Sequence, residues 1–180
     1  IHHKSLIRAI IIPEVSYGVG FWAACKALER SFYFGVEWIE AARFFKKDIF
    51  TRLGGYDEAL TGPEDFDFPQ LVKTEYGSWS TGRIVAHIKH NEGKLTLWKT
   101  LQKKFYYGKK MKSYRSKKHN VAYINKQSSL LARYAIFFSK PEVLLRNPLL
   151  GLGMLIMKFS EMFALALGYM TGIIAGKKNV

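Results

Sequence analysis

Hydrophobic positions along the chain fall into short β-branched runs and longer segments with helical spacing. The compact apolar runs 6–12, closed by Pro13, and 84–88 predict buried strands. Helices are predicted where apolar residues recur every three or four positions or where glycines bound a segment: 21–34, 47–53, 64–76 and 95–107. No internal repeat is present, so the pattern predicts an α/β fold.

The C-terminal region is strongly apolar. Residues 149–157 and 162–176 carry no charge and are separated by Lys158 and Glu161. Neither run alone reaches the ~18–20 residues that span a bilayer, whereas 148–176 as one helix would. Lys158 and Glu161 could then neutralise each other at i, i+3. We expect a membrane-associated segment, whether it spans, re-enters or lies in the interface; the alternative is a buried hairpin of a soluble domain.

Glycines in this region have a regular spacing. Gly168, Gly172 and Gly176 lie four residues apart, which places them on one face of a helix. Small residues on one face let a second helix approach closely. The spacing predicts helix pairing here, with a homodimer as one form of it.

The charge is concentrated in the middle of the chain. The 180 residues carry 28 Lys+Arg and 14 Asp+Glu, a net charge of +14, and thirteen of the bases lie between Gly93 and Pro141 without any acid. Such a segment could bind nucleic acid, anionic lipid headgroups or only solvent. Because an apolar stretch follows it, membrane lipids are the preferred partner, ahead of nucleic acid.

Composition excludes several classes of protein. The 48% of apolar residues and 15% of aromatic residues exclude a disordered tail. The single cysteine, Cys25, excludes a disulfide scaffold or a cysteine-based zinc site. No P-loop, GxGxxG or Ser/His/Asp set is present.

One acidic cluster stands out as candidate chemistry. Glu64, Asp65 and Asp67 follow a Gly-Pro turn at the start of a predicted helix. Helix N-termini stabilise carboxylates, so these acids could be simple capping residues. A carboxylate fixed there is also well placed to take a proton from a hydroxyl.

Five motifs follow one another along the chain: 40–45 (EAARFF), 50–58 (FTRLGGYDE), 62–68 (GPEDFDF), 90–93 (HNEG) and 103–108 (KKFYYG). Their order resembles the C-terminal half of family 2 glycosyltransferases, which have the GT-A fold. The resemblance covers about residues 10–110. The QxxRW motif of processive members is absent, since 101–105 reads LQKKF.

This resemblance implies an inverting transferase with a Rossmann-like, nucleotide-diphospho-sugar type of fold. Asp65 would be the general base on the acceptor hydroxyl, and Glu64 would position the acceptor. His90 would be the metal or diphosphate contact, with His87 as the alternative. Substrate-binding positions would be Arg43, Gly54, Gly55, Tyr56, Asp57, Lys103 and Lys104.

The resemblance also implies partners and an arrangement of the chain. The donor would be a nucleotide sugar or a polyprenyl-phosphate sugar, and the acceptor a lipid-linked or surface glycan at the cytoplasmic face of a membrane. A divalent cation (Mg²⁺ or Mn²⁺) would be bound mainly by a preceding half with an Asp-x-Asp motif, which the 63 residues before Glu64 lack. The 180 residues alone are therefore expected to be inactive.

We expect three regions: an acceptor-side catalytic part (1–110), a basic juxtamembrane linker (111–147) and an apolar membrane-associated segment (148–180). The competing hypothesis is a non-catalytic module that binds membranes or nucleic acid on a transferase-like scaffold.

Overall fold

The computed structural model describes residues 6–60 and 62–177. Its strands and helices are mixed along the chain, as the α/β expectation requires, and helices predominate. The strands are β1 (Ala9–Ile11), β2 (Glu14–Val19), β3 (Ala42–Phe45), β4 (Thr81–Arg83) and β5 (Ile88–Lys94). The helices of the first half are α1 (Phe21–Phe32), α2 (Lys47–Arg52), α3 (Glu64–Tyr76) and the 3-10 turn η1 (Ser78–Ser80).

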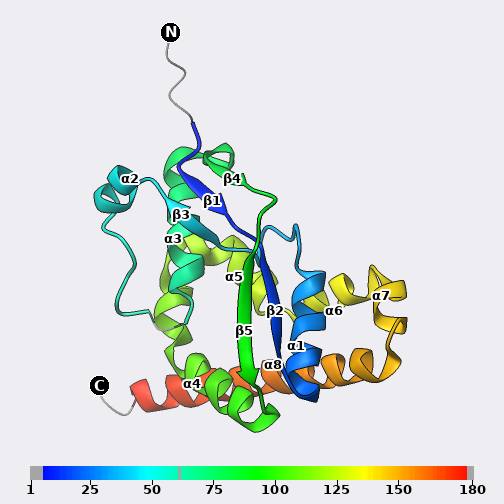
Figure 1. The fold of residues 1–180 in the computed structure, drawn as a ribbon. Coiled ribbons are helices and arrows are strands. Elements are labelled where there is room, and N and C mark those ends of the chain that lie inside the picture. The colour runs from blue at the N-terminus through cyan, green and yellow to red at the C-terminus, as the bar shows by residue number, and fades with distance from the viewer. Residues whose placement is uncertain (1–5, 61, 178–180) are drawn as a thin grey trace.

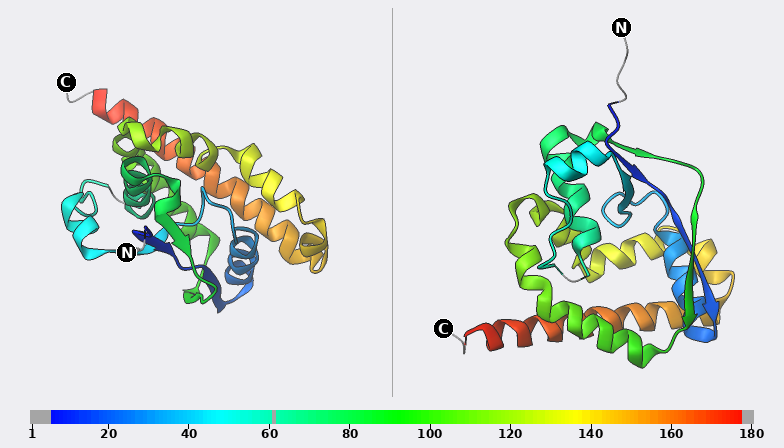
Figure 2. Two further views of the ribbon diagram at one scale, coloured as in Figure 1. Left: turned by 90° about the horizontal axis from the view of Figure 1, so that it is seen from above. Right: turned by 60° about the vertical axis from the view of Figure 1, so that its left-hand side comes forward.

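The second half of the described chain is helical after β5. Its elements are α4 (Leu97–Ser116), η2 (Lys118–Asn120), α5 (Val121–Gln127), α6 (Leu130–Phe138), α7 (Pro141–Leu145) and α8 (Pro148–Lys177). α4 and α8 run side by side along the base of the molecule, below the strands (Figures 1 and 2). The expected boundary at 110/111 falls inside α4, so the basic segment begins within a helix that packs on α8.

Residues 9–19 and 81–94 each contribute one strand to both small sheets, and β3 adds a third strand to the first sheet. β1 pairs in parallel with β4 and in antiparallel fashion with β3, and the next strands, β2 and β5, pair in parallel. Pro13 lies at the break between the two sheets and has no N–H to donate. Its carbonyl still accepts the N–H of Ile88 at 2.8 Å.

Most predicted helices are confirmed and one predicted strand is wrong. α1, α2 and α3 begin where expected, and α3 also ends where expected, at Tyr76. The apolar run 84–88 is not a strand, because 84–87 connect β4 to β5 and Val85 is almost fully exposed. The strand instead occupies 88–94, whose polar side chains conceal it from a hydrophobicity pattern.

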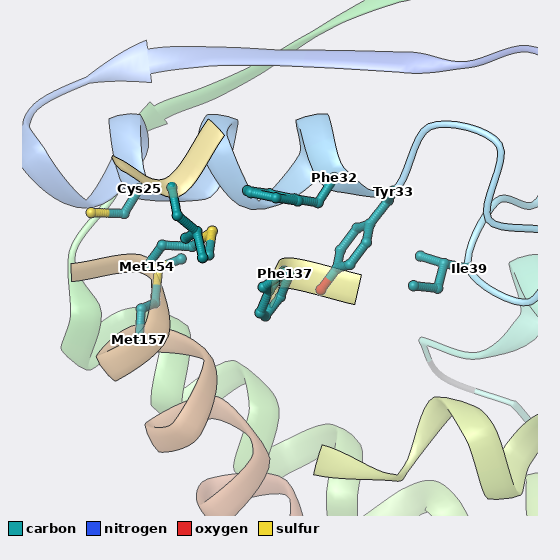
Figure 3. Close-up of a cluster of buried hydrophobic side chains, with 8 residues drawn as sticks. Cys25, Phe32, Tyr33, Ile39, Phe137, Met154 and Met157 are labelled. Carbon is teal, nitrogen blue, oxygen red and sulfur yellow. The ribbon is translucent and has the colours of Figure 1, made fainter. Parts of the chain in front are cut away.

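The main core joins the N-terminal and C-terminal helices. Phe137 of α6 contacts Phe32 at the end of α1 and the neighbouring Tyr33, with ring centroids 5.5 and 5.9 Å apart. Met154 and Met157 of α8 lie in the same cluster, near Cys25 of α1 (Figure 3). A second cluster packs β1 and β3 against α2 and α3.

A closed ring of four charges fixes α8 to α1. Lys26 contacts Glu29 and Glu161 at 2.5 Å each, and Lys158 contacts the same two carboxylates at 2.5 and 2.6 Å. All four residues are buried, and the Tyr33 hydroxyl donates a further bond to Glu29. The expected i, i+3 pair of Lys158 and Glu161 is thus present, and α1 supplies a second pair to it.

The glycine face of α8 is covered by α4 of the same chain. A Cβ atom at Gly168 would lie 2.0 Å from the carbonyl oxygen of Phe105, and one at Gly172 would lie 2.6 Å from that of Lys109. On α4, a Cβ atom at Gly108 would lie 2.2 Å from the carbonyl oxygen of Leu165. The helix pairing at Gly168 and Gly172 is intramolecular, and a homodimer through these two glycines would have to displace α4. The surroundings of Gly176, the third glycine of the predicted face, lie outside what the structure describes.

Candidate functional site

The acidic cluster lies in the first turn of α3, directly after the Gly62-Pro63 turn. Gly62 has a φ of +100°, which favours glycine, and the Pro63 carbonyl accepts the N–H groups of Phe66 and Asp67 at 2.9 and 3.0 Å. No side chain caps the helix, and its first turn contains all three acids. The carboxylates therefore lie near the positive end of the helix dipole. The three acids nevertheless have three different environments.

Asp65 is held by an arginine and remains open to solvent. Its Oδ2 lies 2.5 Å from Nη1 of Arg43, whose Nη2 lies 2.7 Å from Oε1 of Glu14. Burial alone would lower the pKa of Arg43, but Asp65 and Glu14 raise it above its ordinary value, so the guanidinium stays charged. The Asp65 side chain is 39% exposed and can accept a further hydrogen bond from an incoming hydroxyl.

Glu64 has one buried oxygen without a partner. Its Oε2 makes no hydrogen bond among the described residues. Buried polar atoms in folded proteins are normally hydrogen-bonded, so this oxygen lacks a donor that a bound molecule or another chain segment could supply. The expected role of Glu64 in positioning an acceptor is compatible with this environment.

The Gly54-Gly55 turn brings Tyr56 next to the acids. Both glycines have positive φ, 83° and 69°, and the Tyr56 ring packs 5.3 Å from Phe50 and 5.6 Å from Phe68. Partial burial raises the pKa of the Tyr56 hydroxyl, and the negative charge of Asp65 raises it further. The structure therefore brings together Asp65, Arg43 and the Gly54–Tyr56 turn.

Asp57 is a structural residue of the same turn. It accepts the N–H of Ala59 at 2.8 Å, and its other oxygen lies 2.7 Å from Nζ of Lys117. The hydrogen bond from Lys117 lowers the pKa of Asp57 below its ordinary value. Both carboxylate oxygens are engaged, which favours support of the turn over direct contact with a substrate.

Asp67 has a role that sequence reasoning missed. It is buried and binds three residues that follow α4: Lys117 at 2.7 Å, His119 at 2.9 Å and Asn120 at 2.6 Å. These contacts join α3 to the basic segment across about fifty residues of chain, a separation that no local motif reports. The only sequence signal for this buried role of Asp67 was its place between two phenylalanines of α3.

The two lysines of the KKFYYG motif point in different directions. Lys103 is exposed, with its Nζ 5.6 Å from the Tyr107 ring. Lys104 lines a cavity of about 160 Å³ together with Gly62, Pro63 and Glu161. Burial lowers the pKa of Lys104 to about 8. Lys104 therefore reaches the turn before Glu64 from inside the protein, whereas Lys103 does not share that cavity.

The histidines do not form a metal centre with the residues described. His90 on β5 is half exposed, and its nearest acidic atom is Oε2 of Glu92 at 3.8 Å. His87 lies in the exposed connection before β5. Across residues 6–60 and 62–177, no group of three His, Cys, Asp or Glu side chains is arranged to hold a metal ion. His90 as a metal contact therefore remains a prediction from the resemblance.

Comparison with known proteins adds no assignment. The chain was compared with protein families, curated proteins and solved structures, and no significant match was found. The resemblance to family 2 glycosyltransferases rests on the sequence motifs alone.

Proposed function

We propose that the chain is the acceptor-side part of a membrane-associated, inverting glycosyltransferase with a GT-A fold. The donor is a nucleotide sugar or a polyprenyl-phosphate sugar, and the acceptor is a lipid-linked or surface glycan at the cytoplasmic face. The observation that supports this most is the Asp65 carboxylate. It is held by Arg43 at 2.5 Å and partly open to solvent, and the preceding residue, Glu64, has a buried oxygen without a hydrogen bond.

In the proposed reaction, the acceptor hydroxyl attacks the anomeric carbon of the donor as its proton passes to Asp65. The new bond forms between the acceptor oxygen and the anomeric carbon, while the bond from that carbon to the phosphate oxygen breaks. The phosphate or diphosphate leaves with the electron pair. Arg43 orients the carboxylate, and Glu64 accepts a hydrogen bond from the acceptor sugar.

A divalent cation would stabilise the charge on the leaving group. The described residues do not supply a ligand set for it. No step assigned to Asp65, Glu64 or Arg43 depends on that cation.

The test uses the complete protein in membranes from expressing cells. Wild type and Asp65→Asn are incubated with a panel of labelled nucleotide sugars, and label is counted in the lipid extract. We expect transfer by wild type and a loss of at least ~100-fold in the variant, the lower range for a general base. Asp48→Asn, an exposed acid on α2, is the matched control and should keep full activity.

Equal transfer by wild type and Asp65→Asn would remove the catalytic assignment. No transfer with any donor would favour the alternative, a non-catalytic module that binds membranes or nucleic acid. That alternative further predicts salt-sensitive binding that depends on the lysines and not on Asp65.

A further inference from the structure

The outer face of α8 carries a continuous apolar stripe. Its exposed large side chains recur every three or four residues and point away from the protein: Leu149, Leu152, Ile156, Phe159, Phe163, Leu167, Met170 and Ile174. The opposite face holds Met154, Met157 and the buried charges Lys158 and Glu161. By length and composition, 148–175 could cross a membrane. Only one of its two faces is exposed, however, because the other packs against the rest of the protein.

α4 continues this apolar surface. Trp98 and Phe105 of α4 are exposed and border a groove of about 500 Å³, whose other wall contains Phe159 and Phe163 of α8. The residues that follow at helical spacing on the same face of α4 are Lys109 and Lys112, which are also exposed. The groove shows that the outer faces of α4 and α8 open to the same side of the molecule.

The charge of this surface has one sign. α4 contains seven Lys or Arg and no acid, and the single acid of α8, Glu161, is buried in the charge ring with α1. An exposed apolar stripe bordered only by cations fits a membrane with anionic headgroups. A protein partner with only acidic side chains would pair with the lysines but would leave the aromatic groove exposed to water.

A transmembrane course of α8 is incompatible with these contacts. The backbone of α4 touches α8 from Gly168 to Gly172, and Phe21 and Cys25 of α1 touch it at Gly153. A spanning α8 would carry the lysines of α4 into the hydrocarbon or would break the charge ring with α1. A charged side chain at the bilayer centre is energetically unfavourable.

We propose that α4 and α8 form a docking platform that lies in the plane of an anionic membrane, with the α8 stripe and the Trp98–Phe105 groove inserted among the acyl chains. α8 then lies in the interface between the headgroups and the acyl chains, and both of its ends stay on the same side of the membrane. This inference is independent of transferase activity, because it rests on the platform and not on Asp65.

The first test measures binding of the purified full chain to vesicles, by flotation on neutral phosphatidylcholine or on a 7:3 mixture with phosphatidylglycerol. We expect preference for the mixture. Phe159→Ser/Phe163→Ser should weaken binding to it at least tenfold, whereas Lys109→Gln/Lys112→Gln should reduce only the preference, by roughly fivefold per lysine. Leu131→Ser, an exposed apolar residue of α6 outside the groove, is the control and should bind like wild type.

The second test determines topology in sealed membrane vesicles of both orientations from expressing cells. Single cysteines at the exposed positions Leu145 and Ala175 flank the stripe, and the native Cys25 is buried. With an impermeant maleimide, the proposal expects both sites to be labelled in one vesicle orientation and both protected in the other. Opposite protection of the two sites would show a spanning helix and overturn the proposal. So would a Phe159→Ser/Phe163→Ser variant that dissociates a dimer while vesicle binding stays unchanged.

Discussion

At the scale of single residues, neighbouring side chains of the same type have different functions. Asp65 and Asp67 are two positions apart on α3, yet one is open to solvent beside Arg43 and the other is buried under Lys117 and Asn120. Lys103 and Lys104 differ in the same way, since one is exposed and the other lines the cavity beside Gly62. The environment and not the residue type determines which of them can take part in chemistry.

Lys104 is predicted to destabilise the fold at neutral pH. Its pKa is lowered from 10.5 to about 8 by burial. Below pH 8 the amine is charged in both states, so the folded protein bears the full cost of burying it. Between pH 8 and 10.5 only the folded state loses its proton, so the penalty shrinks as pH rises.

The variant Lys104→Met should therefore unfold at higher denaturant than wild type at pH 7. The expected gain is about 1–3 kcal/mol; the lower end allows for solvent screening of this partly exposed side chain. Urea unfolding in mild detergent at pH 7 and pH 9.5 would measure it, and the gain should be smaller at pH 9.5. The exposed neighbour, Lys103→Met, is the control and should change stability by no more than ~0.5 kcal/mol. A Lys104→Met gain independent of pH would contradict the burial argument.

At the scale of elements, the sequence predicted helices better than strands. α3 was predictable because its acids and its Gly77 mark both ends. The apolar composition of residues 148–176 was compatible with one long helix or with a buried hairpin, and the structure has one helix. β5 was missed because Ile88–Lys94 is polar and gains its order from pairing with β2, about 75 residues away. The motif order selected Asp65, Arg43 and the Gly54–Tyr56 turn as candidates, whereas the environments of Asp67 and Lys104 depend on long-range packing.

The close contact of α4 and α8 predicts the effect of one added methyl group. Gly168→Ala should destabilise the protein by about 1–3 kcal/mol, because its Cβ would meet the Phe105 carbonyl and force the helices apart. If no other helix packed against this position, Gly168→Ala would instead stabilise the protein by ~1 kcal/mol. A close α4–α8 contact and its absence therefore predict changes of opposite sign.

Thermal unfolding in detergent of wild type and Gly168→Ala decides between them. Ala166→Leu, on the exposed side of α8, is the control for added bulk and should be near neutral. If Gly168→Ala instead raised the melting temperature, α4 and α8 could not lie as close as the structure places them.

At the scale of the whole molecule, α8 is part of the core as well as the helix that could associate with a membrane by its length and composition. Cys25 and Phe32 of α1 pack with Met154 and Met157 of α8 in one hydrophobic cluster. The expected division into a catalytic part and an apolar tail would separate these residues. The charge ring ties the same two helices together. One face of α8 is therefore buried in the core, whereas the other is exposed and apolar. The proposed membrane docking would couple membrane binding to folding through this one helix.

The contribution of the charge ring to stability can be measured by substitution. Lys158 contacts Glu29 and Glu161, so Lys158→Met leaves two buried carboxylates with only Lys26 to balance them. Burial alone would raise the pKa of Glu29, and it is the two lysines that hold that pKa well below its ordinary value. We expect a loss of about 3–5 kcal/mol for Lys158→Met, as for other broken buried pairs.

The double variant Lys158→Met/Glu161→Leu removes one charge of each sign and leaves Lys26 paired with Glu29. Its loss should be smaller than that of Lys158→Met alone, because no unbalanced buried charge remains. Denaturant unfolding of the wild type, both single variants and the double variant gives the coupling free energy directly, and we expect it to exceed ~2 kcal/mol. Additive losses would mean that Lys158 and Glu161 contribute independently to stability.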